Sequence, residues 1–143
     1  MRRWQQRSRM NKTGHRNLQL ALLFSDRFCE QLGFHKSVKE RVAMIYRKIL
    51  EKRLGRGRSI ETIVAACVYV VNQEMRLART LEEISMTTKI STKDISRMQR
   101  EIKRELKIRT PLQLPGQYIA AFGNKLDLSL ETINYANHIC DMA

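Results

Sequence analysis

The residues with the clearest chemical potential lie in one short segment, GRGRSIETIVAAC (residues 55–67), where two glycines, two arginines and a serine precede an apolar run. A glycine-rich turn that opens a helix often holds phosphate, because free N–H groups and the positive end of the helix dipole point outward there. Arg56, Gly57, Arg58 and Ser59 are therefore candidate ligands for a nucleotide phosphate or for DNA phosphates. The alternative is a plain helix-ending glycine with both arginines in solvent.

The same segment lacks the features of a nucleotide-binding enzyme. Its spacing differs from the G-x-x-x-x-G-K-[ST] of a P-loop, and no strand pattern precedes it. The chain also has no Ser-His-Asp or Cys-His arrangement with supporting context. We therefore predict a protein that is not an enzyme, with no catalytic residue and no cofactor.

The cysteines and histidines do not have the spacing of a metal site. Cys29, Cys67 and Cys140 are far apart, each in an apolar pattern, and no CxxC occurs. This predicts buried free thiols in a reducing compartment, cytoplasmic in a prokaryote and nuclear in a eukaryote. No apolar stretch is long enough to span a membrane, and the basic start lacks the apolar core of a signal peptide.

Charge is the strongest signal in the composition. The chain of 143 residues has a net charge of +13. Residues 1–58 contribute +12 and residues 89–109 contribute +5, whereas residues 59–88 and 110–143 each come to −2. Two basic blocks on a near-neutral scaffold favour a nucleic acid as partner, and less often an acidic membrane face.

The first sixteen residues, MRRWQQRSRMNKTGHR, contain six Lys/Arg, no acidic residue and almost no apolar periodicity. This composition predicts an extended or disordered arm. A basic arm with an aromatic residue is typical of contact with nucleic acid or a large partner, and a solvated tail is the alternative. The candidate contacts are Arg2, Arg3, Trp4, Arg7 and Arg9.

From residue 17 onward the apolar periodicity is that of consecutive helices, and no alternating run predicts a strand. The third of these helices, IETIVAACVYVVNQEM, is apolar nearly all round and therefore belongs at the centre of a bundle. The predicted fold class is all-α. The expected caps and stops are Asn17 and Gly33 for the first helix, a Ser37–Glu40 capping box for the second (to about Leu54), Ser59 for the third, a Thr80–Glu83 capping box for the fourth, and Ser91 for the fifth.

Residues 80–106, TLEEISMTTKISTKDISRMQREIKREL, predict a short helix, a turn and a longer basic helix. In this arrangement the second helix can enter a major groove and read bases with residues near its start, here Ser91, Thr92, Lys93 and Ser96. A helical hairpin with a solvated basic face and a face that docks on a protein are the alternatives.

An internal repeat occurs at an offset of 94 residues, with Phe28, Leu32 and Phe34 recurring as Phe122, Leu126 and Leu128. The first unit has five predicted helices and the second only two before Ala143. Two helices cannot close a core, so we expect either that the chain is a fragment of a two-repeat protein or that the second unit packs on the first or on another molecule. A homo-oligomer could form through the side chains expected to be exposed there, Ile133, Tyr135, Ile139 and Met142.

Taken together, these segments resemble the archaeal form of the transcription factor IIB family. The resembling features are RRWQQRSR, RNLQLAL, YRKILEKRLGRGRSIETIVAACVY, ARTLEEIS and KISTKDISR, which cover nearly the whole chain in order. The resemblance implies a cyclin-like fold, with a linker arm at 1–16, a five-helix repeat at 17–109 and the first two helices of a second, incomplete repeat at 110–143.

The resemblance also implies a general initiation factor that joins the TATA-binding protein on promoter DNA and helps recruit RNA polymerase. Residues 1–16 match a linker that enters the polymerase cleft. The segment Arg56–Ser59 matches contacts to the DNA backbone downstream of the TATA element. The basic helix matches the one that faces the acidic surface of the TATA-binding protein, through Lys93, Arg97, Arg100 and Arg104.

The chain departs from the family pattern at three points. It lacks the N-terminal zinc ribbon, its second repeat stops before the helix–turn–helix that reads the element upstream of TATA, and Thr92 stands where a second lysine is usual. We therefore expect no sequence-specific readout of that element and a weaker contact at Thr92. Two other functions stay open: a stand-alone helix–turn–helix regulator and a cyclin-type module that binds only a protein, such as a kinase.

Overall fold

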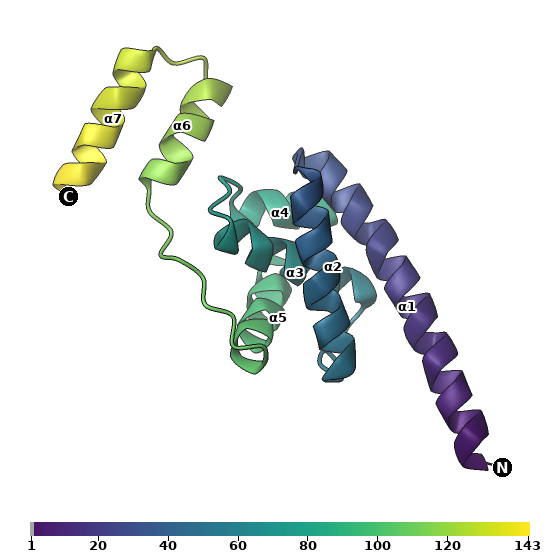
Figure 1. The fold of residues 1–143 in the computed structure, drawn as a ribbon. Helices are drawn as coiled ribbons and strands as arrows, with labels where there is room; N and C mark the ends of the chain where they lie inside the picture. The colour runs from purple at the N-terminus through teal and green to yellow at the C-terminus, as the bar shows by residue number, and fades with distance from the viewer. Residues whose placement is uncertain (1) are drawn as a thin grey trace.

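The computed structural model describes residues 2–143, with side chains from residue 12 onward, and these residues form seven helices and no strand. The all-α prediction is confirmed. Figure 1 shows a bundle of five helices, α1–α5, and a separate pair, α6 and α7, which we call the C-terminal hairpin. The helices are α1 (Arg2–Leu32), α2 (Lys36–Glu51), α3 (Ile60–Glu74), α4 (Leu81–Thr88), α5 (Thr92–Glu105), α6 (Gly116–Lys125) and α7 (Leu130–Met142).

Helix α3 is the centre of the bundle, as its apolar composition predicts. It packs against α1, α2, α4 and α5. Residues 63–68 and 70–72 of α3 are all buried, including Asn72, whose side-chain amide is satisfied by the backbone of Arg79. Each surrounding helix packs one apolar face against α3, so α3 forms the centre of a single hydrophobic core.

Most of the predicted helix ends are confirmed. Gly33 follows α1 with a positive φ, Ser59 caps α3, and Ser91 caps α5. Thr80 and Glu83 form the expected reciprocal capping box at the start of α4. Helix α4 continues to Thr88, so the predicted turn after it is shorter than expected.

The predicted cap of α2 is wrong. Helix α2 begins one residue before Ser37, and the Nδ1 atom of His35 accepts the hydrogen bond from the Ser37 N–H at 3.3 Å. Because a histidine nitrogen can replace the usual hydroxyl acceptor, the S-x-x-E pattern was misleading here.

The extended arm predicted for residues 1–16 is also wrong, because α1 is a continuous helix from Arg2 to Leu32 and Asn17 lies inside it. The physical reason is local: Arg, Gln, Met and Lys are good helix formers, and no proline interrupts the segment. The lack of apolar periodicity in residues 1–16 indicates only that these residues are not buried. A helix that is already nucleated can continue without burial.

The C-terminal hairpin repeats the geometry of the α1–α2 hairpin at the offset of 94 residues. The turn after α1 has a bond from the Phe34 N–H to the Cys29 carbonyl at 2.8 Å, and the turn after α6 has the equivalent bond from Leu128 to Gly123 at 2.9 Å. Helices α2 and α7 begin at equivalent positions, residues 36 and 130. The exact domain boundaries stay predictions.

The hairpin buries far less of its apolar surface than the bundle does. Tyr135, Ile139 and Met142 are exposed as expected, whereas Ile133 is buried because its side chain packs onto the backbone of α6 at Gly123. The prediction that Ile133 is exposed is therefore wrong. Pairing of two copies through this hairpin stays a prediction.

Candidate nucleic-acid interface

The loop between α2 and α3, residues 52–58, carries the first candidate site, and we call it the basic loop. Gly55 has φ +73° and is buried; a Cβ there would lie 2.8 Å from Cδ1 of Ile63 and 3.2 Å from Cε of Met98. Glycine is thus required both for the backbone conformation and for the close approach to α3 and α5. This fixes the base of the loop against the core.

Gly57 has a different role, because it lies at the exposed tip of the loop. Its φ is +79°, and a Cβ there would meet nothing within 4 Å. The turn is closed by a hydrogen bond from the Arg58 N–H to the Gly55 carbonyl at 3.1 Å. The open space leaves the backbone accessible to a phosphate, in keeping with the role predicted for Gly57.

The two arginines of the loop are not equivalent. Arg56 is exposed and has no ion pair with any residue from 12 to 143. Arg58 is only 28% exposed, and its guanidinium lies 3.8 Å from the carboxylate of Glu101 on α5. Arg56 is therefore the freer cation, and Arg58 is held in place by a partner that partly neutralises it.

Ser59 acts mainly as a helix cap. Its Oγ accepts a hydrogen bond from the Thr62 N–H at 3.2 Å and lies 2.8 Å from the Thr62 hydroxyl. The remaining first-turn N–H groups of α3 have no partner within the helix, which is the usual anion-attracting feature of a helix start. The carboxylate of Glu61 in the same turn opposes an anion there.

Helix α5 carries the second candidate site. Lys93, Arg97, Arg100 and Arg104 are all exposed, and their spacing places them within about 60° of one another around the helix. We call these four residues the α5 stripe. The opposite face is buried through Ile95, Met98 and Ile102, each 0% exposed.

Local contacts orient part of the α5 stripe. The Nε of Arg100 donates to the Ser96 carbonyl at 3.1 Å, and the Nε of Arg104 donates to Glu105 at 3.2 Å. Lys103, at the edge of the stripe, is half-buried and bonds to the side chain of Gln73, and this burial lowers its pKa. The four stripe residues thus form the cationic face of α5, whereas Lys103 packs against the rest of the bundle.

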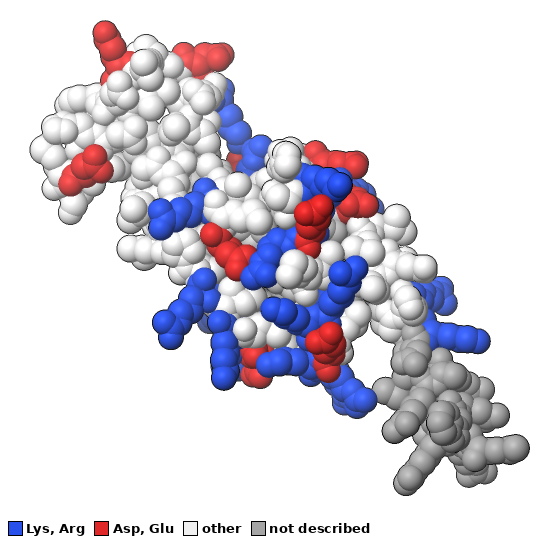
Figure 2. All heavy atoms as spheres, viewed as in Figure 1, with Lys and Arg blue, Asp and Glu red and all other residues white. Residues whose placement is uncertain are grey.

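The two candidate sites are adjacent in the folded chain. Besides the Arg58–Glu101 pair, the Nζ of Lys52 donates to the Glu105 carbonyl at 2.8 Å, so the basic loop lies along the second half of α5. Figure 2 shows Lys and Arg side chains gathered over the bundle, while the C-terminal hairpin is mostly white. The structure thus places the basic loop beside α5, with Glu101 and Glu105 on the flank of the helix between the loop and the α5 stripe. We call the basic loop and the α5 stripe together the cationic surface.

Sequence reasoning missed four further basic residues that are close to these sites in the chain. They belong to the last turns of α2 and the start of the loop, and the signal that could have found them is the charge run in YRKILEKRL. They are Arg47, Lys48, Lys52 and Arg53, all exposed. The arm residues Arg2, Arg3, Trp4, Arg7 and Arg9 have helical backbones, and their side chains lie outside the described part.

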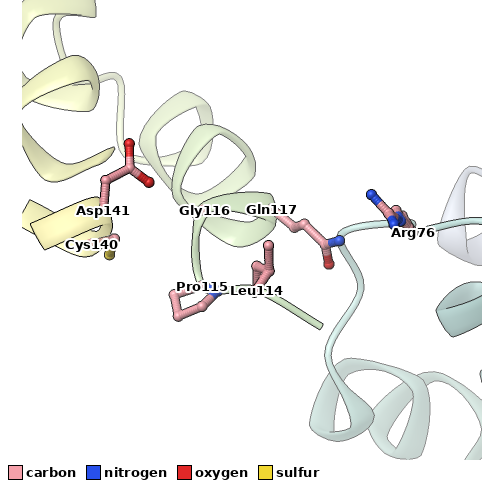
Figure 3. Close-up of a pocket in the computed structure, with 7 residues that line it drawn as sticks. All are labelled: Arg76, Leu114, Pro115, Gly116, Gln117, Cys140 and Asp141. Carbon is pink, nitrogen blue, oxygen red and sulfur yellow. The ribbon is translucent and has the colours of Figure 1, made fainter. Parts of the chain in front are cut away.

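The hollows of the molecule lie elsewhere. A cavity of about 390 Å³ opens between the α3–α4 turn, the start of α6 and the end of α7, with Arg76, Gln117 and Asp141 in its lining (Figure 3). None of the candidate residues above lines it. An exposed cationic face suits an extended anion such as DNA.

The three cysteines differ in burial. Cys29 and Cys67 are buried, and burial raises the pKa of both thiols, whereas Cys140 is only partly buried, contrary to expectation. From residue 12 to 143, no three His, Cys, Asp or Glu side chains gather where a metal ion could bind. Within the described residues, no helix has the length and apolarity needed to cross a membrane.

Comparison with known proteins supports the resemblance. The family model described as Transcription factor TFIIB repeat matches residues 15–105. Transcription initiation factor IIB of Saccharolobus shibatae is 42% identical over 142 residues, which is 99% of this chain and 46% of that protein. Transcription initiation factor IIB 2 of Thermoplasma acidophilum is 40% identical over 143 residues, all of this chain and 47% of that protein.

A third relative, Transcription initiation factor IIB of Archaeoglobus fulgidus, is 42% identical over the whole chain and 44% of its own length. The chain thus spans less than half the length of these relatives. The match covers the bundle, the basic loop and the α5 stripe. The chain therefore belongs to the transcription factor TFIIB repeat family, in agreement with the cyclin-like, all-α fold expected from its motifs.

Proposed function

We propose that this chain is the core of a general transcription initiation factor, which binds the TATA-binding protein on promoter DNA and helps recruit RNA polymerase. The observation that carries the proposal is the exposed positive charge of the basic loop and of the α5 stripe, which lie beside each other in the folded chain. Its relatives are named transcription initiation factor IIB, which supports the same role. No catalytic step and no cofactor enter the proposal.

In this proposal the basic loop contacts the DNA backbone. Arg56 and Arg58 donate to phosphates, and the exposed backbone at Gly57 allows a phosphate to approach closely. Such contacts fix position and orientation without reading bases. Binding to DNA alone is therefore weak, and a second protein must place the duplex against the loop.

The α5 stripe contacts the TATA-binding protein in the same proposal. Lys93, Arg97, Arg100 and Arg104 present four charges on one face, which suits a complementary acidic protein surface. Residues 2–16, with Arg2, Arg3, Trp4, Arg7 and Arg9, extend α1 beyond the bundle toward RNA polymerase. The factor works where promoter DNA is, in the cytoplasm of an archaeal cell.

A gel-shift titration tests this function. A labelled duplex with a TATA element is titrated with the chain, with and without an archaeal TATA-binding protein, and a duplex of scrambled TATA sequence is the control. We expect weak, salt-sensitive binding to DNA alone and much tighter binding to the protein–DNA complex, because phosphate contacts dominate the former. Equal affinity with and without the TATA-binding protein would refute the proposal.

A stand-alone helix–turn–helix regulator is the second candidate, favoured by one observation. Helices α4 and α5 are joined by the short segment Lys89–Ser91, and Lys93 projects into solvent at the start of α5. The Ser91 hydroxyl is already bonded to Asp94, so fewer groups are free to read bases. Selection from random duplexes without any partner protein decides: enrichment of one sequence would favour this candidate.

A further inference from the structure

Basic residues occupy backbone positions that normally belong to glycine. Among the described residues, the non-glycine residues with positive φ are Arg53, Arg76, Lys89, Lys107 and Asp127. Each follows the end of a helix, where the chain turns into the left-handed region. An L side chain is strained there and glycine is not, so four cations at such positions need a reason.

Arg53 and Arg76 have the same local geometry. The N–H of Arg53 bonds to the Leu50 carbonyl at 3.2 Å, and the next N–H bonds to Ile49 at 3.0 Å. After α3, the N–H of Arg76 bonds to Gln73 at 3.3 Å, and the next N–H bonds to Asn72 at 2.9 Å. The two are therefore the same helix-ending motif, with an exposed arginine at the position that favours glycine.

A cation at the end of a helix also interacts favourably with the helix dipole, and this effect applies equally to both arginines. The surroundings of the two differ. Arg53 directly follows Lys52, which is anchored on the Glu105 carbonyl, and it precedes Arg56 in the basic loop. Arg76 instead lines the cavity beside α6 and α7.

Residues 47–58 hold six Lys/Arg and a single acidic residue, Glu51. Arg53 is exposed and has no ion pair with any described side chain, so its charge is available to an anion. Strained backbone persists where function requires the residue that bears the strain. The dipole effect explains both arginines in part, and only Arg53 lies on the cationic surface.

We propose that Arg53 is kept in the left-handed conformation because its guanidinium contacts a DNA phosphate, which extends the DNA-binding surface from Arg56–Ser59 back to the start of the basic loop, next to the end of α2. This rests on the function proposed above. Arg53 then lowers the stability of the fold but raises the affinity for DNA. Arg76 has the same strain and does not contact DNA.

The substitution Arg53→Gly tests the proposal with two readouts of opposite sign. Removing the strain should raise Tm by about 3 °C. Removing one phosphate contact should lower the affinity for the complex of TATA-binding protein and DNA about eightfold at 0.1 M salt, and should reduce the slope of log K against log salt by about 0.9. Arg53→Lys should keep most of the affinity, because it keeps the charge.

Arg76→Gly is the matched control, because it relieves the same strain and removes the same charge from a helix end. It should raise Tm similarly and leave both the affinity and the salt slope unchanged. If Arg53→Gly binds as tightly as the wild type, or if Arg76→Gly weakens binding as much, the inference fails. Arg56→Glu, measured alongside, separates the two proposals: if it too binds normally, the proposed DNA contact itself is wrong.

Discussion

The bundle and the C-terminal hairpin contain equivalent apolar residues and the same turn, but these residues are buried only in the bundle. Phe28 and Leu32 of α1 are 0% and 4% exposed, whereas their equivalents Phe122 and Leu126 in α6 are 40% and 69% exposed. The turns between the paired helices are the same. The difference is α3: the α1–α2 hairpin lies on a buried apolar helix, and no described helix lies on the equivalent face of α6 and α7.

Charge divides the two regions in the same way. The cationic surface belongs to the bundle, and Lys125 is the only lysine or arginine from residue 110 onward. It is bonded to Glu83 at the start of α4. The bundle thus has both the closed core and most of the positive charge, so the residues proposed to contact DNA belong to the same part of the chain that forms the core.

Core truncation should give the largest effect. Phe28→Ala should destabilise the chain by about 3–5 kcal/mol, because it removes a fully buried ring from a closed core. Phe122→Ala should cost less than about 1 kcal/mol, because that ring is partly in solvent and its ring contacts are with Tyr118 and the ammonium of Lys125. Urea unfolding measures both. An equal cost for the two would show that the hairpin has a covered core of its own.

Charge reversal should come next in size. Arg56→Glu with Arg58→Glu should weaken binding to the complex of TATA-binding protein and DNA about 60-fold at 0.1 M salt, if two phosphate contacts are lost. Arg97→Glu with Arg100→Glu should instead weaken the contact with the TATA-binding protein, measured by pull-down without DNA.

The hairpin offers the control for charge reversal, Asn134→Glu with His138→Glu, which adds negative charge on the exposed face of α7. These substitutions should leave unchanged both the affinity for the complex of TATA-binding protein and DNA and the contact with the TATA-binding protein alone. Since the basic loop and α5 are adjacent, equal loss of the same step by both arginine pairs would mean that they bind one partner rather than two.

The smallest expected effect is the pH dependence of the contact between the two regions. Burial alone would raise the pKa of Glu83, but bonds from Lys125 and the Thr80 N–H, with Arg79 nearby, hold its pKa below the ordinary value of 4.5. A carboxylate with a lowered pKa in the folded state stabilises above its ordinary pKa, and this contribution is lost as pH falls through the lowered value.

Thermal unfolding of wild type and Glu83→Gln checks this. The difference in Tm between the wild type and the variant should have its largest value at about pH 6 and should become smaller below about pH 4.5. A difference that stays constant down to pH 3 would show that ionisation of Glu83 contributes nothing to the link between α4 and α6.

Local sequence signals predicted local structure well. Ser59, Thr80 with Glu83, and Ser91 cap their helices because each needs only a hydroxyl and an N–H two or three residues away. Two of the failures were also local: His35 replaced Ser37 as the cap of α2, and α1 continued through residues with no apolar pattern. The candidate residues of α5 came from the resemblance to the transcription factor IIB family, and their function stays a prediction.

Composition and periodicity were enough to predict that the chain is all-α, that α3 is central and that two basic segments carry the excess charge. That the two basic segments lie side by side, through contacts of Lys52 and Arg58 with α5, is visible only in the folded chain. The tertiary structure alone also placed Ile133 inside the hairpin and left Arg53 in a strained conformation. The physical reason is that such contacts join residues distant in the chain, or depend on a backbone angle that residue type does not reveal.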